Sequence, residues 1–351
     1  MMQEKTNSLQ RVLTTIGHKE PDKVPLFLLV TMHGAKELGM SIKQYFSKAE
    51  NVVKGQLILR EKYDNDCIYA IFYGAIEVEA WGGEAIFFED GPPNSGRPFI
   101  RHKEDIQALV LPNIEESKPL NEVLRAIELL KSEVDDEVPI IGVVMSPFSV
   151  PVMQMGFKNY IELIYEDREL FNLLMKINKE FCINWANAQI AAGATAIGYF
   201  DPVSSPTIIP RELYLNTGFR IAQDTIAKFN GPTAIHLASG STLPIIDDLA
   251  KTGTVIVGVS ALEDLNAIKD ACRNKLTILG NLNGIEMCRW TPKQAEAIVK
   301  DVITKAGPGG GFILSDNHGE IPYQVPENVL CAISDAVNKW GKYPLEWIKD
   351  E

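Results

Sequence analysis

The chain has 351 residues, of which 46% are hydrophobic and 23% charged, a composition that provides ample core for one large α/β domain or two smaller ones. Its net charge of −12 argues against a protein that binds nucleic acid or a membrane surface. The chain has no apolar run long enough to span a bilayer, no secretory signal and no CxxC pair among its 5 cysteines, so we expect a cytoplasmic protein without disulfides.

Short apolar segments alternate along the chain with longer amphipathic ones. Strands of a parallel sheet covered on both faces are expected at 24–30, 66–72, 138–145, 194–200, 232–238, 253–259, 276–282 and 310–316. Helices are expected at 49–63, 159–193, 243–253, 263–274 and 291–307. Thr291 before Pro292 is typical of an N-cap followed by proline at the first helical position.

This alternation predicts an α/β fold, a (β/α)8 TIM barrel that forms a single domain over residues 1–351. The elaborated segment 78–106 combines strand-like alternation, turn residues and aromatic residues, and we expect it over or beside the barrel mouth. An open doubly wound sheet is the alternative, but no G-x-G-x-x-G or G-x-x-x-x-G-K-[ST] motif follows the first strands.

Polar residues at the ends of the predicted strands are the candidates for function, because barrel enzymes carry their chemistry where strands end and βα loops begin. Three of the 5 histidines fall at such ends, namely His33, His236 and His318. Our candidate catalytic residues are His236, His318 and Asp201. Our candidate substrate-binding residues are Met145, Tyr199, Ser239, Asn281 and Asn317. A cap or turn is the ordinary alternative for a single polar residue, notably for Asn281 and for Asp201 before Pro202.

Several stretches in chain order resemble the uroporphyrinogen decarboxylase superfamily over nearly the full length. They are "VEAWGGE" with "DGPP" and "EDIQAL", "GYFDPVSSPTIIPRELY", "IHLASGST", "ILGNLNG" and "GGGFILSDNHGEIPYQVPENV". Within the superfamily, the chain looks like the corrinoid-linked methyltransferase branch, typified by methylcobalamin:coenzyme M methyltransferases. This resemblance implies a (β/α)8 barrel, in agreement with the pattern of segments.

The first strand separates the two branches of this superfamily. The decarboxylase carries an arginine-rich segment after that strand, which holds the carboxylates of a porphyrinogen. No arginine occurs here between Arg11 and Arg60, so a highly anionic tetrapyrrole lacks its cationic clamp. Decarboxylation of uroporphyrinogen is therefore disfavoured.

The methyltransferase branch carries His-x-Cys where this chain reads His236-Leu237-Ala238, and a cysteine where this chain has His318. In that branch a zinc ion turns a thiol substrate into a thiolate. The resemblance therefore implies a zinc site with His236 and His318 as ligands and with both thiolates lost. The third ligand stays open among Asp201, Asp316 and Glu320. We expect residue 238 to face the site, two residues after His236 along the strand.

Three functions remain open. The first is a methyltransferase that moves a methyl group between a small substrate (a thiol, tetrahydrofolate, a methyl ether or a methylamine) and the cobalt of methylcobalamin or a corrinoid protein. Because no D-x-H-x-x-G motif occurs, the corrinoid would sit on a separate protein that docks at the barrel mouth. The second is a decarboxylase-like lyase on another substrate, with Asp201 or His318 as acid or base and no metal. The third is a non-catalytic corrinoid-binding barrel. Exposed barrel helices could also pair two copies into a homodimer.

Overall fold

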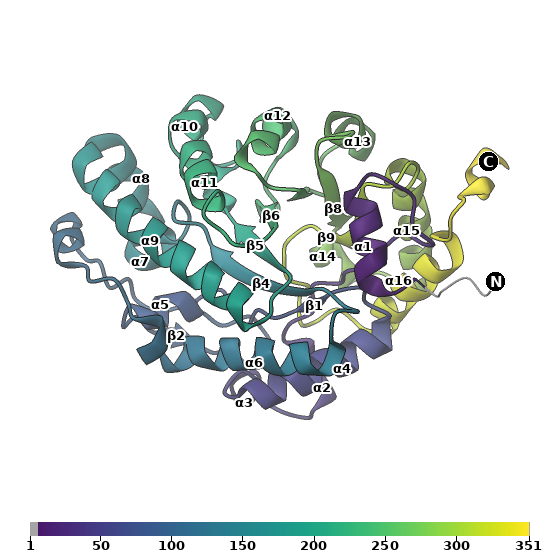
Figure 1. The fold of residues 1–351 in the computed structure, drawn as a ribbon, viewed down its shortest axis with the longest axis horizontal. Coiled ribbons are helices and arrows are strands. Elements are labelled where there is room, and N and C mark those ends of the chain that lie inside the picture. Colours follow the sequence, from purple (N-terminus) through teal and green to yellow (C-terminus); the bar gives the residue numbers. More distant parts are fainter. Residues whose placement is uncertain (1–5, 351) are drawn as a thin grey trace.

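The computed structural model describes residues 6–350 and contains a seven-stranded parallel sheet that curls into a barrel (Figure 1). The strands, in their order across the sheet, are β1 (Ile68–Tyr69), β4 (Ile140–Met145), β5 (Ala196–Phe200), β6 (Thr233–His236), β7 (Ile256–Gly258), β8 (Thr277–Leu282) and β9 (Phe312–Asp316). Each lies within a segment predicted from the sequence, and the predicted barrel fold is confirmed.

The segment predicted as the first strand closes the barrel without forming a regular strand. On one side, Leu26 makes a parallel bridge to Leu314 of β9. On the other, the Leu26 carbonyl accepts the N–H of Asp66 at 2.7 Å, and the Leu26 N–H donates to the Asp66 carboxylate at 2.9 Å. The Leu28 N–H donates to the side-chain oxygen of Asn65, also at 2.9 Å. Side-chain oxygens thus replace backbone carbonyls along this seam.

Side chains alternate along the strands between the barrel interior and the layer of helices. The interior holds an inner cluster of Val12, Phe27, Leu29, Cys67, Tyr69, Val143, Leu279 and Ile313, against which Ile16 and Phe200 pack. Their strand neighbours, such as Ile68 and Val144, belong to the larger core between sheet and helices. Both faces of each strand are therefore apolar, which explains the continuous apolar runs of the sequence.

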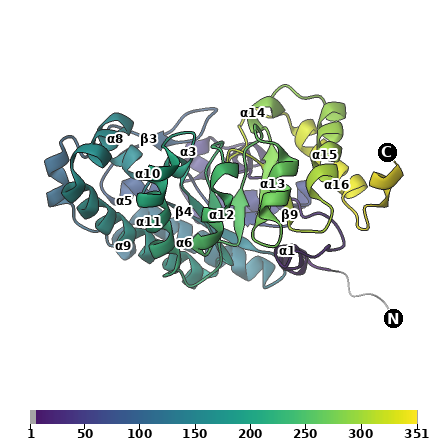
Figure 2. The same ribbon diagram turned by 90° about the horizontal axis from the view of Figure 1, so that it is seen from above.

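Helices surround the sheet (Figures 1 and 2). They are α1 (Ser8–Ile16), α2 (His33–Glu37), α3 (Ile42–Tyr45), α4 (Ala49–Tyr63), α5 (Ile76–Ala80), α6 (Lys118–Val134), α7 (Pro151–Met155), α8 (Phe157–Glu166), α9 (Arg168–Ala192), α10 (Arg211–Asn216), α11 (Gly218–Ile226), α12 (Ile246–Leu249), α13 (Leu265–Cys272), α14 (Gly284–Met287), α15 (Pro292–Ala306) and α16 (Glu327–Trp340). Short 3-10 helices are η1 (Lys103–Ala108), η2 (Ile114–Glu116), η3 (Pro202–Ser204), η4 (Leu243–Ile245), η5 (Ala250–Thr252) and η6 (Glu346–Asp350). Thr291 caps α15 with Pro292 at its first position, as predicted.

The prediction of one long helix over 159–193 is wrong at one residue. Asp167 leaves the helical region (φ −138°, ψ 82°) and divides the segment into α8 and α9. Its carboxylate accepts the N–H of Leu170 at 3.2 Å and so caps α9. The cause is the usual competition between an aspartate side chain and the backbone for amide donors.

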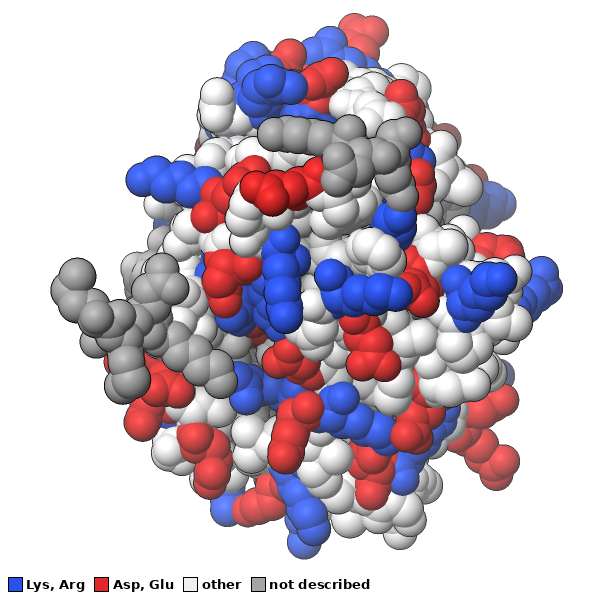
Figure 3. All heavy atoms as spheres, turned by 90° about the vertical axis from the view of Figure 1, so that its right-hand side faces the viewer, with Lys and Arg blue, Asp and Glu red and all other residues white. Residues whose placement is uncertain are grey.

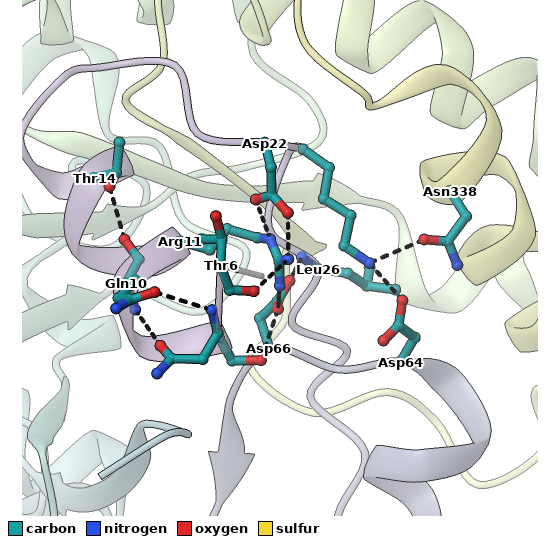
Figure 4. Close-up of polar contacts among 12 residues, drawn as sticks. Thr6, Gln10, Arg11, Thr14, Asp22, Leu26, Asp64, Asp66 and Asn338 are labelled. Carbon is teal, nitrogen blue, oxygen red and sulfur yellow. Dashed lines mark hydrogen bonds and ion pairs between the residues drawn. The ribbon is translucent and has the colours of Figure 1, made fainter. Parts of the chain in front are cut away.

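Helix α1 covers the end of the barrel at which the strands begin, opposite α14, which follows β8 (Figure 2). Val12 of α1 belongs to the inner cluster. Arg11 of the same helix donates to Asp66 at 2.5 Å and to Asp22 at 2.6 and 2.7 Å (Figure 4). Because Asp66 also accepts the Leu26 N–H, this ion cluster ties α1 to the seam of the barrel.

The elaborated segment forms α5, a two-stranded antiparallel sheet of β2 (Ala85–Ile86) and β3 (Asn94–Ser95), and η1. Figures 1 and 2 place it near α8, at the end of the molecule away from the chain termini. Gln324, in the loop after β9, donates to the Asp90 carbonyl at 2.6 Å. The segment therefore reaches a loop at the carboxyl ends of the strands.

The surface on the right-hand side of Figure 1 carries lysine and arginine interspersed with aspartate and glutamate (Figure 3). No continuous basic area is visible on the described part of this face, as expected for a chain with a net charge of −12.

Candidate functional site

His236 ends β6 inside the barrel, between two neighbours in register. Phe200 of β5 stacks on its imidazole, with ring centroids 4.9 Å apart and an interplanar angle of 16°. Gly258 of β7 lies on its other side, where a Cβ atom would be 2.2 Å from the ring carbon Cδ2. The imidazole thus occupies the space that a side chain at position 258 would need, so glycine is required there.

The hydrogen bonds of His236 fix its tautomer. The strand ends at this residue, and Ala238 adopts a left-handed conformation (φ 51°) that brings its N–H to Nδ1 at 3.0 Å. Burial, with a smaller effect from the charge of His318, lowers the pKa of His236 to about 4, so the ring is neutral at pH 7. Since Nδ1 accepts, the single proton lies on Nε2, which is buried and has no hydrogen-bond partner among residues 6–350. His236 therefore offers a free N–H donor.

This turn also removes the reason to expect residue 238 to face the site. The strand alternation that would place Ala238 on the same side as His236 stops at His236. Ala238 is half-buried, and the next predicted site residue, Ser239, is exposed.

The loop after β9 packs against the rings of Phe200 and His236. Gly319 has a φ of 89°, and a Cβ atom there would lie 2.3 Å from the Phe200 ring and 3.4 Å from Cε1 of His236. Asp316 accepts the N–H groups of His318 (2.8 Å) and Gly319 (3.0 Å) with Oδ2, which holds the loop in place. The structure thus brings His236, His318 and Asp316 together at the carboxyl ends of the strands.

Several polar atoms of this loop are buried and without a partner among the described residues. They are Oδ1 of Asp316, Oδ1 of Asn317 and Nδ1 of His318. Native proteins rarely leave such atoms unpaired, because each costs about 1–3 kcal/mol. The unpaired atoms mark where a ligand can complete the hydrogen bonding.

Two carboxyl groups here hold their protons near neutral pH. Burial raises the pKa of Asp316 to about 7. Burial and the Asp316 charge also raise the pKa of Glu320 to about 7, against the effect of the hydroxyl that Thr31 donates to it. Tyr69 of β1 donates to the Gly319 carbonyl at 3.2 Å. Proton donors therefore surround the bend at Gly319.

Asp201, a candidate for catalysis and for metal binding, lies wholly buried in a ring of hydroxyls. Ser146 and Ser149 donate to its Oδ1 at 2.5 and 2.7 Å, and Ser204 donates to its Oδ2 at 2.6 Å. Both oxygens are thus engaged by the loops after β4 and β5. The structure gives Asp201 a positioning role, since it fixes these two loops to each other.

Tyr199, predicted to bind substrate, faces away from the interior. It alternates with Phe200 on β5, belongs to the larger core, and lies 6.3 Å from Phe229 between ring centroids. The prediction placed it on the wrong face of the strand. Asn281 donates to the Ser260 carbonyl at 3.1 Å and so joins the loops after β7 and β8.

Met145, which was also predicted to bind substrate, lies in register with Phe200 of β5 and is half-buried. Its N–H donates to Glu77 of α5 at 2.8 Å. Burial raises the pKa of this carboxyl to about 8. Helix α5 therefore fixes the end of β4 through a protonated glutamic acid.

Sequence reasoning noted His33 at a strand end but did not include it in the site. Its imidazole is buried, neither ring nitrogen has a hydrogen-bond partner in the described part of the chain, and burial lowers its pKa to about 3. Tyr69 and Phe200 were also missed; their signal is the period-two alternation, which places them on the interior face.

A zinc ion held by His236, His318 and a carboxylate does not fit these residues. In residues 6–350 no group of three or more His, Cys, Asp and Glu side chains is arranged to hold a metal ion. A ligating imidazole normally donates its other N–H to an oxygen, whereas Nδ1 of His236 accepts a backbone N–H and leaves the proton on Nε2. What the side chains offer a substrate is hydrogen bonding and proton transfer.

Replacing Gly258 with alanine should lower activity at least about tenfold, because the new methyl must displace the His236 ring or strain the core by about 1–3 kcal/mol. Gly198→Ala is the matched control, since the nearest atoms to its Cβ would be 3.6 Å away, an ordinary contact. Turnover and thermal unfolding of both variants measure the effect. Equal activity in the two would show that the position of His236 does not matter.

Comparisons with known proteins show the family of the chain and its fold. In the described residues no helix is long and apolar enough to cross a membrane. The chain is 26% identical over 280 residues to a uroporphyrinogen decarboxylase of Cellvibrio japonicus, covering 76% of this chain and 77% of that protein.

Two solved structures share the fold. A methyltransferase from Methanosarcina mazei superposes with a TM-score of 0.85 at 21% identity, covering 95% of this chain and 99% of that one. A B12-independent methionine synthase from Shewanella sp. W3-18-1 superposes with a TM-score of 0.55 at 11% identity, covering 92% and 95%. The family model described as uroporphyrinogen decarboxylase (URO-D) matches residues 7–340. Since that match spans nearly the whole chain, this protein belongs to the URO-D family.

Proposed function

We propose that this protein is a methyltransferase that moves a methyl group between a small substrate and the cobalt of a corrinoid, carried by a separate protein. The observation that carries the proposal is the free Nε2–H of His236 at the carboxyl end of β6. By resemblance, this is the position of the ligand histidine in the corrinoid-linked branch. The likeness to a Methanosarcina mazei methyltransferase supports the same branch.

The residues of the chain can handle the substrate's heteroatom and its proton. A bound corrinoid would supply the cobalt that gives or takes the methyl group. The Nε2–H of His236 donates to the heteroatom of the substrate, and Phe200 and Gly319 restrict the place where that atom can sit. Asp316 and Glu320, with pKa values near 7, give a proton to a heteroatom that loses its methyl group or take one from a heteroatom that gains it.

Two lysines at or beside α2 have protein partners. Lys36, in α2, donates to the Tyr323 carbonyl and lies 4.0 Å from the centre of the Tyr323 ring. Lys62, on α4, pairs with Glu37 (2.7 Å) and Glu327 (2.9 Å). Both cations therefore have protein partners, which supports a substrate other than a porphyrinogen.

The rim of the barrel supports docking of a corrinoid protein. Exposed apolar side chains occur in the segments that follow several barrel strands: Ile86 and Phe88 after β1, Ile208 after β5, Leu262 after β7 and Ile285 after β8. Leu262 is 83% exposed. Apolar residues grouped around a site favour protein contact over solvent, because their burial is the main gain in association.

Methyl transfer can be measured directly with the purified protein and free methylcobalamin under anaerobic conditions. With a thiol or tetrahydrofolate as acceptor, we expect loss of the methylcobalamin absorbance at least about ten times faster than without protein, a modest part of what acid–base groups supply. Zinc content is determined on the same sample. Release of carbon dioxide from uroporphyrinogen, without any methyl transfer, would contradict the proposal. Binding of cobalamin without turnover would point to a non-catalytic corrinoid-binding barrel.

A decarboxylase-like lyase on another substrate is the second candidate, and the protonated carboxyl groups favour it. Asp316 and Glu320 could each give a proton to the carbanion left when carbon dioxide departs. In that case the protein would release carbon dioxide from a small carboxylic acid and would not demethylate methylcobalamin.

A further inference from the structure

A cavity of about 480 Å³ lies at the opposite end of the barrel from the candidate site. Its walls come from three segments that meet where β8 and β9 begin: His18 after α1, the end of α13 with the residues that follow it, and the glycine run 309–311. This size lies within the range of small-molecule sites, about 300–1,000 Å³.

The lining of this basal cavity is basic although the chain is acidic. Its charged or titratable side chains include Lys269, Arg273 and His18, and none of its lining residues is Asp or Glu, while the whole chain carries a charge of −12. Two acidic side chains outside the lining contact it: Asp270 accepts from Arg273 at 2.7 Å, and Glu20 accepts the Gly309 N–H at 2.9 Å. The lining itself carries two cationic side chains, Lys269 and Arg273, and no carboxylate, so it favours an anionic ligand.

Lys269 is the central donor. Its ammonium group donates to the Gly310 carbonyl, and its other two N–H bonds make no hydrogen bond to the residues that the structure describes. Burial lowers its pKa to about 8, and its charge contributes to the lowered pKa of neighbouring His18. A half-buried ammonium that keeps free donors can bind an anionic ligand in the cavity.

The opposite wall is backbone that tolerates no side chain. Gly310 (φ 70°) lies so close to Lys19 that a Cβ atom would be 2.2 Å from its carbonyl oxygen. Gly311 (φ 65°) would bring a Cβ atom within 2.6 Å of Nδ1 of His18. Glycine is thus required for these segments to meet, and the cavity is a built feature of the fold.

We propose that the basal cavity binds a small phosphate monoester, with Lys269 and Arg273 as the groups that contact the phosphate. The site is independent of methyl transfer, because it lies at the amino ends of the strands, where α1 covers the barrel. A phosphate offers several acceptor oxygens, which suit an ammonium and a guanidinium that converge on one space. Asn274, also in the lining, can donate to a hydroxyl of the same ligand.

Ribose 5-phosphate is the probe, titrated into the intact protein and followed by calorimetry. We expect a Kd of about 1 mM or tighter, and at least about tenfold weaker binding for Lys269→Gln and for Arg273→Gln. Lys275→Gln is the control, because this exposed lysine pairs with Asp247 and does not line the cavity. Thermal unfolding of each variant verifies folding.

The comparison ligands are ribose and citrate. Binding of ribose as tightly as of its phosphate, or of citrate in preference to the phosphate, would overturn the assignment to phosphate monoesters. The absence of binding by the wild-type protein at about 10 mM would also overturn it, as would equal affinity in both cavity variants and the control.

Discussion

Alanine in place of His236 is expected to reduce turnover about 10²–10⁴-fold, the usual contribution of a group that donates or accepts a proton in the reaction. The barrel should remain folded. The substitution removes one hydrogen bond, from Ala238 to Nδ1, and the ring stack on Phe200, a cost of about 3–5 kcal/mol at most. Steady-state rates and thermal unfolding of the variant measure both effects.

Glutamine and asparagine at position 236 distinguish the roles of the two ring nitrogens. A glutamine amide reaches roughly to the place of Nε2, whereas an asparagine amide reaches only to that of Nδ1. Because Nε2–H is the free donor, His236→Gln should retain part of the activity that His236→Asn loses. If wild-type protein instead holds one zinc ion that both variants lose, the imidazole is a ligand and the tautomer assigned to it is wrong.

Replacement of Arg11 by methionine is expected to lower the free energy of unfolding by about 3–5 kcal/mol, because it leaves a buried carboxylate without its cation. Asp66 is only 1% exposed and contacts Arg11 at 2.5 Å. Unfolding by urea, followed by circular dichroism, measures the loss.

The control for this effect is Arg125→Met. Arg125 pairs with Glu50 on the surface, and both side chains are more than half exposed. A surface pair of this kind contributes about 1 kcal/mol or less. Equal losses in the two variants would mean that the cluster around Asp66 adds nothing beyond an ordinary surface contact. The double variant Arg11→Met with Asp66→Asn should recover part of the stability.

The positions of the strands could be predicted from the sequence because burial on both faces leaves continuous apolar runs. The seam could not, since Leu26 and Leu28 are as apolar as any strand, and their hydrogen bonds go to side chains of Asn65 and Asp66. The break at Asp167 was also hidden, because helical periodicity continues on both sides of the residue.

The candidate site was predicted in part for a similar reason. A strand end is visible in the sequence, so His236 and His318 were found. The turn at Ala238 decides which nitrogen of His236 carries the proton, and no local sequence pattern predicts this turn. Asp201 is engaged by Ser146 and Ser149, which lie more than fifty residues earlier in the chain. Tyr199 was misplaced because both faces of β5 are apolar.

The seam between β9 and β1 affects how the barrel opens. Elsewhere in the sheet, exchange of a backbone amide proton with solvent requires two strands to part, whereas at Leu26 and Leu28 it requires only that one carboxylate or one amide side chain rotate away. Slow deuterium uptake at these two amides would therefore report on the side chains of Asp66 and Asn65. Of the two, the Leu28 amide should exchange first, because its partner is the neutral side chain of Asn65, whereas the Asp66 carboxylate that accepts the Leu26 N–H is also bound by Arg11.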